Sequence, residues 1–429
     1  MAKQDVYHIH PSGWEGDPEE EQFKVSTLDY LTVCTYNNYA LFFRLEDVEK
    51  SRVVEVLIAG LERTLSQARH LCGVIEKDPV GGHSFVKKKD STVRLFVQWL
   101  DSPDVSEDYP SLDEIHDGNY RTSLLGDIQR WSVPPMTYGE KPEAHPDNNP
   151  VVASYKANFI RGGLVFIMHS HHYSNDVMGW AGFTHQLAEN CYAIINETPF
   201  PAWDRTCMDL SRLIKPEVSE EEKVDGPPAP ARHPGHIPAE TLLFHLPKSK
   251  SAELKMLASP TDGSWVSTYD AFSAFIWRTM SRLRAPVFQP DLSAPLFWVE
   301  AVDMRRRFHS PKVASRIQHN VMAGALSSTA PIDAYPSMSI LQTDHRDADI
   351  TSADFGFGTP TTYRHLLDCM TQGVLIIYPP RDKAPESDEG PEFSITYEKS
   401  LKQALIDDVE WNRYFEYRGV DAVEACQTN

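Results

Sequence analysis

The sequence is poor in three features that mark common classes of protein. Its six cysteines, among 429 residues, are scattered and form no Cys-x-x-Cys pair. This argues against a disulfide framework or a zinc knot and favours free thiols in a reducing compartment. Positive charge is also scarce, because the chain has 41 Lys and Arg and 61 Asp and Glu, which gives a formal net charge of −20. Nucleic acids and anionic membranes attract basic surfaces, so the composition argues against both as partners.

Long hydrophobic runs are missing as well. The first residues, MAKQDVYHIHPSGWEGDPEEEQ, contain no apolar signal core, and runs such as GGLVFIM and GVLIIY are too short to span a bilayer. We therefore expect a cytoplasmic protein. Hydrophobic residues still make up 41% of the chain, which is enough for sizeable cores. A chain of this length predicts about two domains.

Apolar periodicity predicts a mixture of helices and strands in the first half. Residues 45–73 have helical spacing, and residues 83–101 indicate two strands around a polar turn. Residues 101–150 are rich in Asp, Pro and Tyr and suggest long surface loops. Residues 154–172 are typical of a hairpin that turns at Arg161–Gly163, and a helix is expected to follow it.

A charged, proline-rich stretch at 215–240 is the expected interdomain linker. It separates an N-terminal domain, 1–214, from a C-terminal domain, 241–429. In the second half, Ser267 and Asp270 form a capping-box pattern at the start of a helix. Further strands are expected over the apolar runs of this half, which are TLLFHL, PLFWVEAVDM, GVLIIY and EFSITY.

The hairpin ends in a cluster of polar residues, HSHHYSND. On a continuing strand His169 and His171 share one face, and His172 points to the other. Three interpretations stay open. His169, His171 and Asp176 could converge on a metal, although no zinc-site spacing is present. The polar residues could cap a buried strand. Alternatively, His172 could act as a base, since an ordinary histidine pKa of roughly 6.5 suits proton transfer near neutral pH.

A second signal is DFGFG at 354–358, which stands between His-Arg-Asp at 345–347 and Ala-Pro-Glu at 384–386. These are three protein-kinase signatures in their usual order. A kinase is nevertheless rejected. Residues 348–353 contain no Asn to hold a metal, and they are too few for the strands that separate the two kinase motifs. No G-x-G-x-x-G loop precedes them to cover ATP phosphates.

The histidine and DFGFG motifs together resemble a known family. H-x-x-x-D at 172–176 followed by DFGFG is similar to the BAHD acyltransferases, which move an acyl group from coenzyme A. Within that family, the chain resembles the fungal branch of trichothecene 3-O-acetyltransferase. The stretches that carry the resemblance are NFIRGGLVFIMHSHHYSND, VSTYDAFSAFIWR, AVDMRRR, SADFGFGTP and EFSITYEKSLKQALIDDVEWNRYFEYRG. They cover most of the chain from about residue 155 onward.

The resemblance implies an α/β fold of two similar chloramphenicol-acetyltransferase-like domains. Each domain would have a mixed sheet, a long crossover would join them, and the active-site channel would lie between them. The family's catalytic histidine corresponds to His172. Its motif aspartate corresponds to Asp176, which would pair with Arg305 and hold the loop in place.

The resemblance also implies supporting residues. Asp354, Gly356 and Gly358 would shape a loop that supports the fold and the coenzyme end without proton transfer. Asn320 or a backbone N–H would stabilise the oxyanion. Coenzyme A carries phosphates, so an acidic chain must gather cations near them. The candidate coenzyme-binding residues are Ser267, Arg278 and Arg282, and further candidate cations are Arg284, Lys248, Lys250 and Lys255.

The implied reaction is a direct transfer. Neutral His172 takes a proton from an acceptor hydroxyl, whose oxygen attacks the thioester carbonyl of acyl-CoA. Acyl-CoA, and acetyl-CoA first of all, is then a co-substrate, and neither a metal nor a permanently bound cofactor is needed. The expected acceptor is a small terpenoid-like alcohol of secondary metabolism, with an amine as the alternative. The family resemblance favours a monomer.

One segment departs from the family pattern. Between Asn320 and Asp354 the chain is shorter than is usual in the family. A shorter segment could widen the acceptor pocket. It could also open the channel to water and leave an inactive relative that binds a metabolite or a partner.

Overall fold

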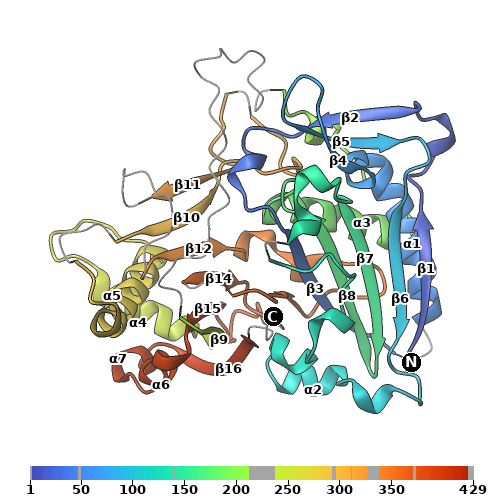
Figure 1. The fold of residues 1–429 in the computed structure, drawn as a ribbon. Helices are drawn as coiled ribbons and strands as arrows, with labels where there is room; N and C mark the ends of the chain where they lie inside the picture. Colours follow the sequence, from blue (N-terminus) through green and yellow to red (C-terminus); the bar gives the residue numbers. More distant parts are fainter. Residues whose placement is uncertain are drawn as a thin grey trace. The chain divides into compact units, whose positions relative to one another are not determined.

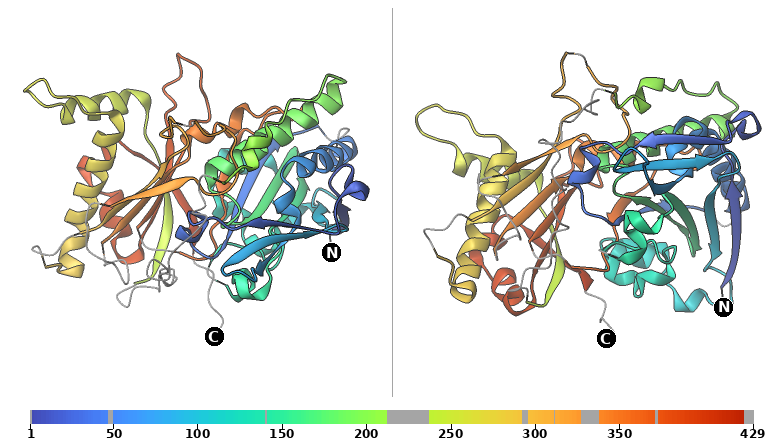
Figure 2. Two further views of the ribbon diagram at one scale, coloured as in Figure 1. Left: turned by 90° about the horizontal axis from the view of Figure 1, so that it is seen from above. Right: turned by 45° about the horizontal axis from the view of Figure 1, so that its top comes forward.

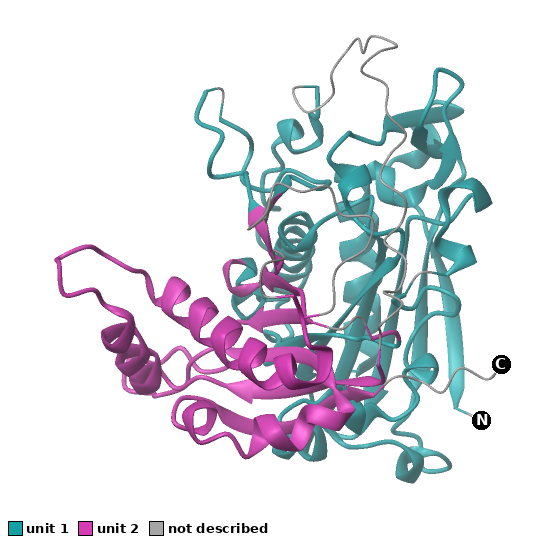
Figure 3. Ribbon diagram, turned by 60° about the vertical axis from the view of Figure 1, so that its left-hand side comes forward, with its two compact units in different colours: residues 1–229, 303–323, 348–368 teal, residues 230–302, 324–347, 369–429 magenta. Residues whose placement is uncertain are grey.

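The computed structural model describes residues 2–46, 50–139, 141–211, 237–291, 296–310, 312–326, 338–370 and 373–423 (Figure 1). Contacts divide the chain into two compact units (Figure 3). Unit 1 comprises residues 1–229, 303–323 and 348–368, and unit 2 comprises residues 230–302, 324–347 and 369–429.

The units are not two continuous halves of the chain. The sequence placed residues 303–323 and 348–368 in a C-terminal domain, whereas the contacts place both segments in unit 1. Most of the expected linker, 215–240, lies outside the described residues, and a strand already begins at Ala239.

A six-stranded mixed sheet forms the centre of unit 1. Only the pair β6–β7 is parallel. The order is β1 (Lys3–Ile9), β6 (Val93–Trp99), β7 (Ala153–Ile160), β8 (Gly163–His171), β3 (Tyr36–Arg44) and β13 (Thr362–His365). Ile160 pairs with Gly163, so β7 and β8 are the predicted hairpin with its turn at the expected residues.

Helices α1 (Lys50–Gln67) and α3 (Val177–Asn196) pack side by side on one face of this sheet (Figure 2). They confirm the helix expected within 45–73 and the helix expected after the hairpin. The ring of Phe183 in α3 stacks on that of Tyr155 in β7, with centroids 6.1 Å apart. Tyr155 therefore faces α3.

The opposite face of the sheet is covered by residues 101–150. This segment contains α2 (Leu112–Asp117) and several short 3-10 turns, and Leu112, Ile115 and Trp131 are fully buried against the sheet. The expectation of loops is therefore confirmed for the irregular backbone, but it was wrong for the apolar residues, which are buried. Its apolar residues follow neither helical nor strand spacing, so no periodicity revealed that they would be buried.

A three-stranded sheet completes unit 1, with the order β2 (Glu20–Lys24), β5 (His83–Lys88) and β4 (Val74–Lys77). The two strands expected within 83–101 are confirmed as β5 and β6. They belong to different sheets, however, so the polar turn between them joins two sheets.

Most of a seven-stranded mixed sheet belongs to unit 2, apart from residues 303 and 322–323. Its order is β11 (Met322–Leu326), β10 (Trp298–Asp303), β12 (Ile340–Asp344), β14 (Val374–Tyr378), β15 (Glu392–Glu398), β9 (Ala239–His245) and β16 (Glu416–Val423). Four of these strands were predicted from their apolar runs. Helices α4 (Lys248–Ala258) and α5 (Thr268–Phe288), with the short α6 (Lys402–Ile406) and α7 (Val409–Asn412), bury its core (Figure 1).

The predicted capping box begins α5. The hydroxyl of Ser267 accepts a hydrogen bond from the N–H of Asp270, and the carboxylate of Asp270 accepts one from the N–H of Ser267. None of the helices in the described ranges has the length and apolar character needed to cross a bilayer. None of the five cysteines in those ranges forms a disulfide.

Candidate active site

Two of the three histidines at the end of β8 bind the segment 101–150, which covers one face of the sheet. The Nε2 of His169 accepts the N–H of Val133 at 3.1 Å, and its Nδ1 donates to the carbonyl of Met136 at 2.8 Å. In His171, Nε2 donates to the carbonyl of Ala144 at 2.8 Å, and Nδ1 accepts the N–H of Tyr173. Both rings are fully buried.

This environment makes both histidines neutral structural residues. Burial lowers the pKa of His169 to about 3 and that of His171 to about 4. No ring nitrogen of either residue is left to bind a metal. Within the described ranges, moreover, no group of three or more His, Cys, Asp or Glu side chains is arranged around a metal position. The metal hydrolase built on His169, His171 and Asp176 is therefore wrong.

His172 differs from its two neighbours in the state of its ring. Its side chain is only half-buried, its Nε2 makes no hydrogen bond to the described residues, and its Nδ1 makes none of ordinary geometry. Burial lowers the pKa of His172. Backbone groups of His172 and Asn175 and the charges of Asp176 and Asp29 raise it, but they offset the effect of burial only in part. The imidazole is thus mostly neutral near pH 7 and can accept a proton at Nε2.

The backbone of His172 is fixed on both sides. Its N–H donates to the carbonyl of Thr35 at 2.8 Å, and its carbonyl accepts a hydrogen bond from Nδ2 of Asn320 at 2.8 Å. Thr35 lies just before β3, and Asn320 lies in the 303–323 segment of unit 1. Segments far apart in the sequence therefore position this one histidine.

Asp176 forms the pair with Arg305 that the family resemblance implied. The guanidinium makes two bonds of 2.9 Å to the two carboxylate oxygens, and both side chains are buried. Asp176 also caps α3, because its carboxylate accepts the N–H of Gly179 at 2.8 Å. It accepts the N–H of Val321 as well, at 2.9 Å.

These bonds decide the role of Asp176. Burial would raise the pKa of Asp176, but the charge and hydrogen bonds of Arg305 outweigh burial and lower it. The carboxylate stays ionised with both oxygens occupied. It connects the loop of residues 172–176, called the histidine loop from here on, to Arg305.

Asn320 does not have the role that the resemblance suggested. An amide nitrogen carries two hydrogens, and both are used. One is donated to Asp29 at 2.9 Å and the other to the carbonyl of His172. Asn320 therefore has no donor left for an oxyanion, and this assignment is corrected to a role in holding His172.

The DFGFG loop lies elsewhere on unit 1. The carboxylate of Asp354 accepts the N–H of Gly356 at 2.8 Å, and Gly356 has a φ of +80°. A Cβ on Gly356 would come within 3.0 Å of the backbone of Tyr192, so the loop packs closely on the C-terminal half of α3. At 1.5 Å per residue, Tyr192 lies roughly 24 Å along α3 from Asp176.

The loop is anchored by its aromatic residues. Phe355 is fully buried and packs edge-on against Phe43 of β3, while Phe357 contacts the same ring. Gly358, with a φ of +143°, closes the turn because its carbonyl accepts the N–H of Phe355. These contacts support the interpretation of Asp354, Gly356 and Gly358 as structural residues.

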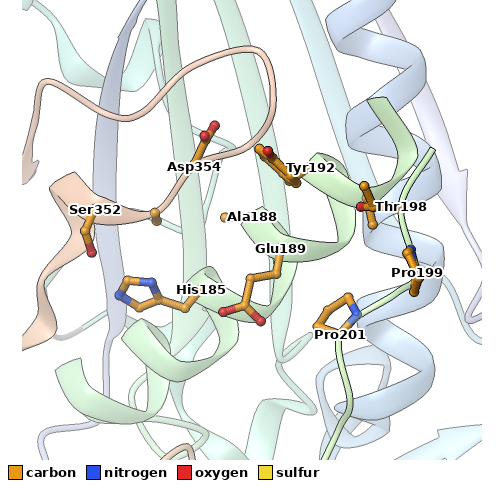
Figure 4. Close-up of a pocket in the computed structure, with 11 residues that line it drawn as sticks. His185, Ala188, Glu189, Tyr192, Thr198, Pro199, Pro201, Ser352 and Asp354 are labelled. Atoms are coloured by element: carbon orange, nitrogen blue, oxygen red, sulfur yellow. The ribbon is translucent and has the colours of Figure 1, made fainter. Parts of the chain in front are cut away.

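A pocket of about 300 Å³ lies between α3 and residues 352–354 (Figure 4). His185, Glu189 and Tyr192 line it from the helix, and Ser352 and Asp354 line it from the loop. Several of its polar groups already bind protein: Nε2 of His185 pairs with a backbone carbonyl at 3.0 Å, and Glu189 pairs with Arg316 at 2.9 Å. It contains no group of the histidine loop.

The candidate coenzyme residues are in unit 2, on α4 and α5. Arg278 pairs with Glu410 at 2.9 Å and Arg282 with Asp408 at 2.7 Å, so carboxylates of the same unit already partly neutralise both charges. Arg284 is fully buried against Glu398 and is not available to a ligand in solution. Ser267 caps its helix, and a coenzyme role for it stays a prediction.

Sequence reasoning missed four residues that bind the histidine loop or its partners: Asp29, Thr35, Gln318 and His319. One signal was present, because Ser26-x-x-Asp29 is a capping-box pattern and the structure contains both of its reciprocal bonds. That pattern predicts a local turn, and it gives no hint of a partner near residue 320.

Comparisons with known proteins agree with this geometry. Residues 35–191 match the family described as the trichothecene 3-O-acetyltransferase-like N-terminal domain. The acetyltransferase FGR3 of Gibberella zeae is 61% identical, over 98% of this chain and 95% of that protein. This alignment has 474 positions, more than the 429 residues of the chain, so the relative has residues that this chain lacks.

Two further comparisons concern more distant relatives. The trichothecene 3-O-acetyltransferase TRI101 of Fusarium sporotrichioides is 24% identical over 90% of this chain and 94% of that protein. The crystal structure of F. graminearum TRI101 in complex with coenzyme A and T-2 mycotoxin has a TM-score of 0.75 at 21% identity, and covers 93% of this chain and all of that one. This likeness confirms the α/β fold with mixed sheets. The chain therefore belongs to the BAHD acyl-CoA-dependent acyltransferases, in the fungal branch that resembles trichothecene 3-O-acetyltransferase.

Proposed function

We propose that this acyltransferase moves an acetyl group from acetyl-CoA to a hydroxyl of a mid-sized, largely apolar alcohol of the terpenoid class, with His172 as general base. The observation that carries the proposal is the contrast within HSHH. His169 and His171 use every ring nitrogen inside the protein, whereas Nε2 of His172 is bonded to no described residue and the backbone of His172 is fixed. The acceptor class is supported by the relatives, whose names include trichothecene 3-O-acetyltransferase and eremophilane O-acetyltransferase.

The reaction needs one proton carrier and no covalent enzyme intermediate. Neutral Nε2 of His172 takes the hydroxyl proton as the oxygen attacks the thioester carbonyl, and a tetrahedral oxyanion forms. The oxyanion collapses, the C–S bond breaks, and His172 returns the proton to the departing thiolate. Products are the acetyl ester and free coenzyme A. Asp176 takes no part in proton transfer, because Arg305 and two backbone N–H groups occupy its oxygens.

The setting of the reaction follows from the same chemistry. Direct transfer requires no metal and no permanently bound cofactor, so acetyl-CoA is a co-substrate only. We place the enzyme in the cytoplasm as a monomer that binds neither nucleic acid nor membranes. The formal net charge of −20 supports the absence of such polyanionic partners.

The test is acceptor-dependent release of coenzyme A thiol. Purified wild type, His172→Ala and the control His116→Ala are mixed with acetyl-CoA, and thiol is followed with a panel of terpenoid alcohols or with water alone. His116 is an exposed histidine of α2, so its loss matches the change in residue type outside the site. We expect thiol release and an acetyl ester by mass spectrometry in wild type and His116→Ala only.

Two outcomes would contradict the proposal. Thiol release by His172→Ala at the wild-type rate would show that His172 is not the general base. If calorimetry detects no binding of acetyl-CoA to the wild type, acetyl-CoA is not the acyl donor. This result would favour the hypothesis that the protein is an inactive relative of the family. Binding of acetyl-CoA without any turnover across the panel would reject the terpenoid alcohols tested as the acceptor class.

A further inference from the structure

Asp29 is a carboxylate with no access to solvent, and none of the reaction steps described above uses it. Its side chain is 0% exposed. Four groups donate to it: the N–H of Ser26 at 2.7 Å, Nδ1 of His319 at 3.0 Å, and the N–H and Nδ2 of Asn320, both at 2.9 Å. Three of these four bonds reach a segment about 290 positions away in the sequence.

The segment that Asp29 holds is strained. His319 has a φ of +71°, in the left-handed region that a residue with a Cβ rarely adopts. Such a conformation costs on the order of 1–3 kcal/mol and persists only where surrounding contacts impose it. Here the contacts come from two sides: Asp29 binds the His319 ring, and Oδ1 of Asn175 accepts the His319 N–H at 2.7 Å.

The strain has a geometric result at the next residue. Asn320 follows His319, and Asp29 accepts both its backbone N–H and one hydrogen of its side-chain amide. The second amide hydrogen is thereby directed to the carbonyl of His172 at 2.8 Å. Six residues after Asp29, the carbonyl of Thr35 accepts the N–H of His172 at 2.8 Å. The segment around Asp29 thus contributes to both backbone bonds of the histidine.

We propose that Asp29 is a positioning residue for His172, which acts through Asn320 and forms a second support of the catalytic loop beside the pair Asp176–Arg305. The proposal rests on the proposed function of His172 as the base. Asp29 does not touch the substrate; it fixes the peptide on which the base is mounted. A geometric error of about 1 Å at a reacting group can reduce a rate by on the order of 100-fold.

Asp29 also has an electrostatic effect on His172 that a carboxylate remote from the imidazole would lack. The negative charge of Asp29 acts on the imidazole and raises the pKa of His172 against the effect of burial. The other ionisable groups that act with it are Asp176, which also raises that pKa, the neutral His171 next to it, and His319, whose ring donates to Asp29. Loss of the Asp29 charge therefore lowers the pKa of His172, so the basic form persists to lower pH.

The first variant is Asp29→Asn, which keeps the shape of the side chain and removes its charge. We expect kcat to fall by about 10- to 100-fold, because the amide cannot accept all four bonds. The KM for acetyl-CoA should stay close to the wild-type value. The acid limb of the pH profile of kcat/KM should move to lower pH.

The second variant, Asn320→Ala, separates the two effects. It removes the bond to the His172 carbonyl and leaves the Asp29 carboxylate beside His319. We expect a fall in kcat similar to that of Asp29→Asn, with the acid limb unmoved. The double variant should be little worse than either single one, because both break the same connection.

Asp17→Asn is the matched control. Asp17 is another buried carboxylate of unit 1, and its ion pairs are with Lys87 and Arg69 and with no residue of the loop 172–176. We expect it to lower the melting temperature without a change in kcat per folded molecule or in the pH profile. If Asp29→Asn behaves as Asp17→Asn does, or if it keeps wild-type kcat, the positioning role is overturned.

A measurement without turnover keeps this test separate from that of the proposed function. The imidazole of His172 is titrated by NMR in histidine-labelled protein, with its signal assigned by its loss in His172→Ala. A lower pKa in Asp29→Asn, and an unchanged one in Asn320→Ala, supports the inference even if no acceptor in the panel is acetylated. Identical titration curves in wild type and Asp29→Asn would overturn it.

Discussion

The two signature loops of unit 1 use an aspartate in opposite ways. Asp176 of the histidine loop is buried, and Arg305 and backbone N–H groups occupy both its oxygens. Asp354 of the DFGFG loop is exposed and holds a single backbone N–H, while Phe355 beside it is fully buried. In the first loop the acidic residue supports the neighbour that we propose as the base, and in the second loop the aromatic residues make the packing contacts. A motif letter therefore does not reveal the role of its residue until its contacts are known.

Arg305→Met should have the largest combined effect, because it breaks the support of the histidine loop. It leaves Asp176 as an uncompensated buried charge, which costs roughly 3–5 kcal/mol of unfolding free energy. We also expect kcat to fall, since the strut beside His172 is lost. Urea denaturation and thiol-release kinetics measure the two effects.

A double variant checks this interpretation. Asn at position 176 is neutral and still caps α3, so Asp176→Asn combined with Arg305→Met should recover part of the stability but not kcat. A stable, fully active Arg305→Met enzyme would show that the pair supports nothing.

Phe355→Ala should be the counterpart in the second loop. Truncation of a fully buried Phe costs about 3–5 kcal/mol of stability. Because the loop lies far along α3 from the histidine, kcat per folded molecule should stay near the wild-type value. Phe357→Ala, at a less buried ring, should cost less. A specific loss of kcat in folded Phe355→Ala would connect this loop to the chemistry.

The structural histidines predict a pH dependence of stability. His169 and His171 have folded pKa values of about 3 and about 4, below the ordinary value near 6.5. Below pH 6.5 the unfolded chain binds protons that the folded chain does not. The unfolding free energy should therefore fall with decreasing pH, by up to roughly 1.4 kcal/mol per pH unit for each histidine, until the folded pKa is reached.

His171→Gln isolates one of these two contributions. Its amide can still donate to the carbonyl of Ala144 but does not titrate. Denaturant titrations at pH 6.5, 5.5 and 4.5 should give a shallower slope than wild type. An unchanged slope would mean that His171 takes up its proton in the folded protein.

Asp354→Ala should have the smallest effect. It removes one exposed hydrogen bond to Gly356, which is worth about 1 kcal/mol or less. Thermal unfolding and thiol release should both stay close to wild type. A loss of kcat well beyond the change in stability would restore this aspartate as a functional residue.

Local patterns made part of this molecule predictable. The hairpin β7–β8 follows from its turn, the helix α3 from its apolar spacing, and the start of α5 from its capping box. Each of these signals involves residues close together in the sequence. The family resemblance selected His172, rather than His169 or His171, as the expected base. Burial and bonding of the neighbouring histidines then gave it a physical reason.

The rest depends on contacts that no local pattern encodes. The strands β5 and β6 look like a hairpin but enter different sheets. Asp29 meets His319 and Asn320 across most of the chain, and Arg305 meets Asp176 across 129 positions. Asn320 appeared to be an oxyanion donor because its residue type fits, and only the count of its occupied hydrogens excluded it.

The central claim is that Nε2 of His172 carries the proton, and the most direct test is chemical rescue of His172→Ala. Acceptor-dependent thiol release is measured in this variant with and without added imidazole. We predict a rate lower by about 10²- to 10⁴-fold, partly restored by imidazole, with a melting temperature near that of wild type. A rate equal to that of wild type without imidazole would contradict the account.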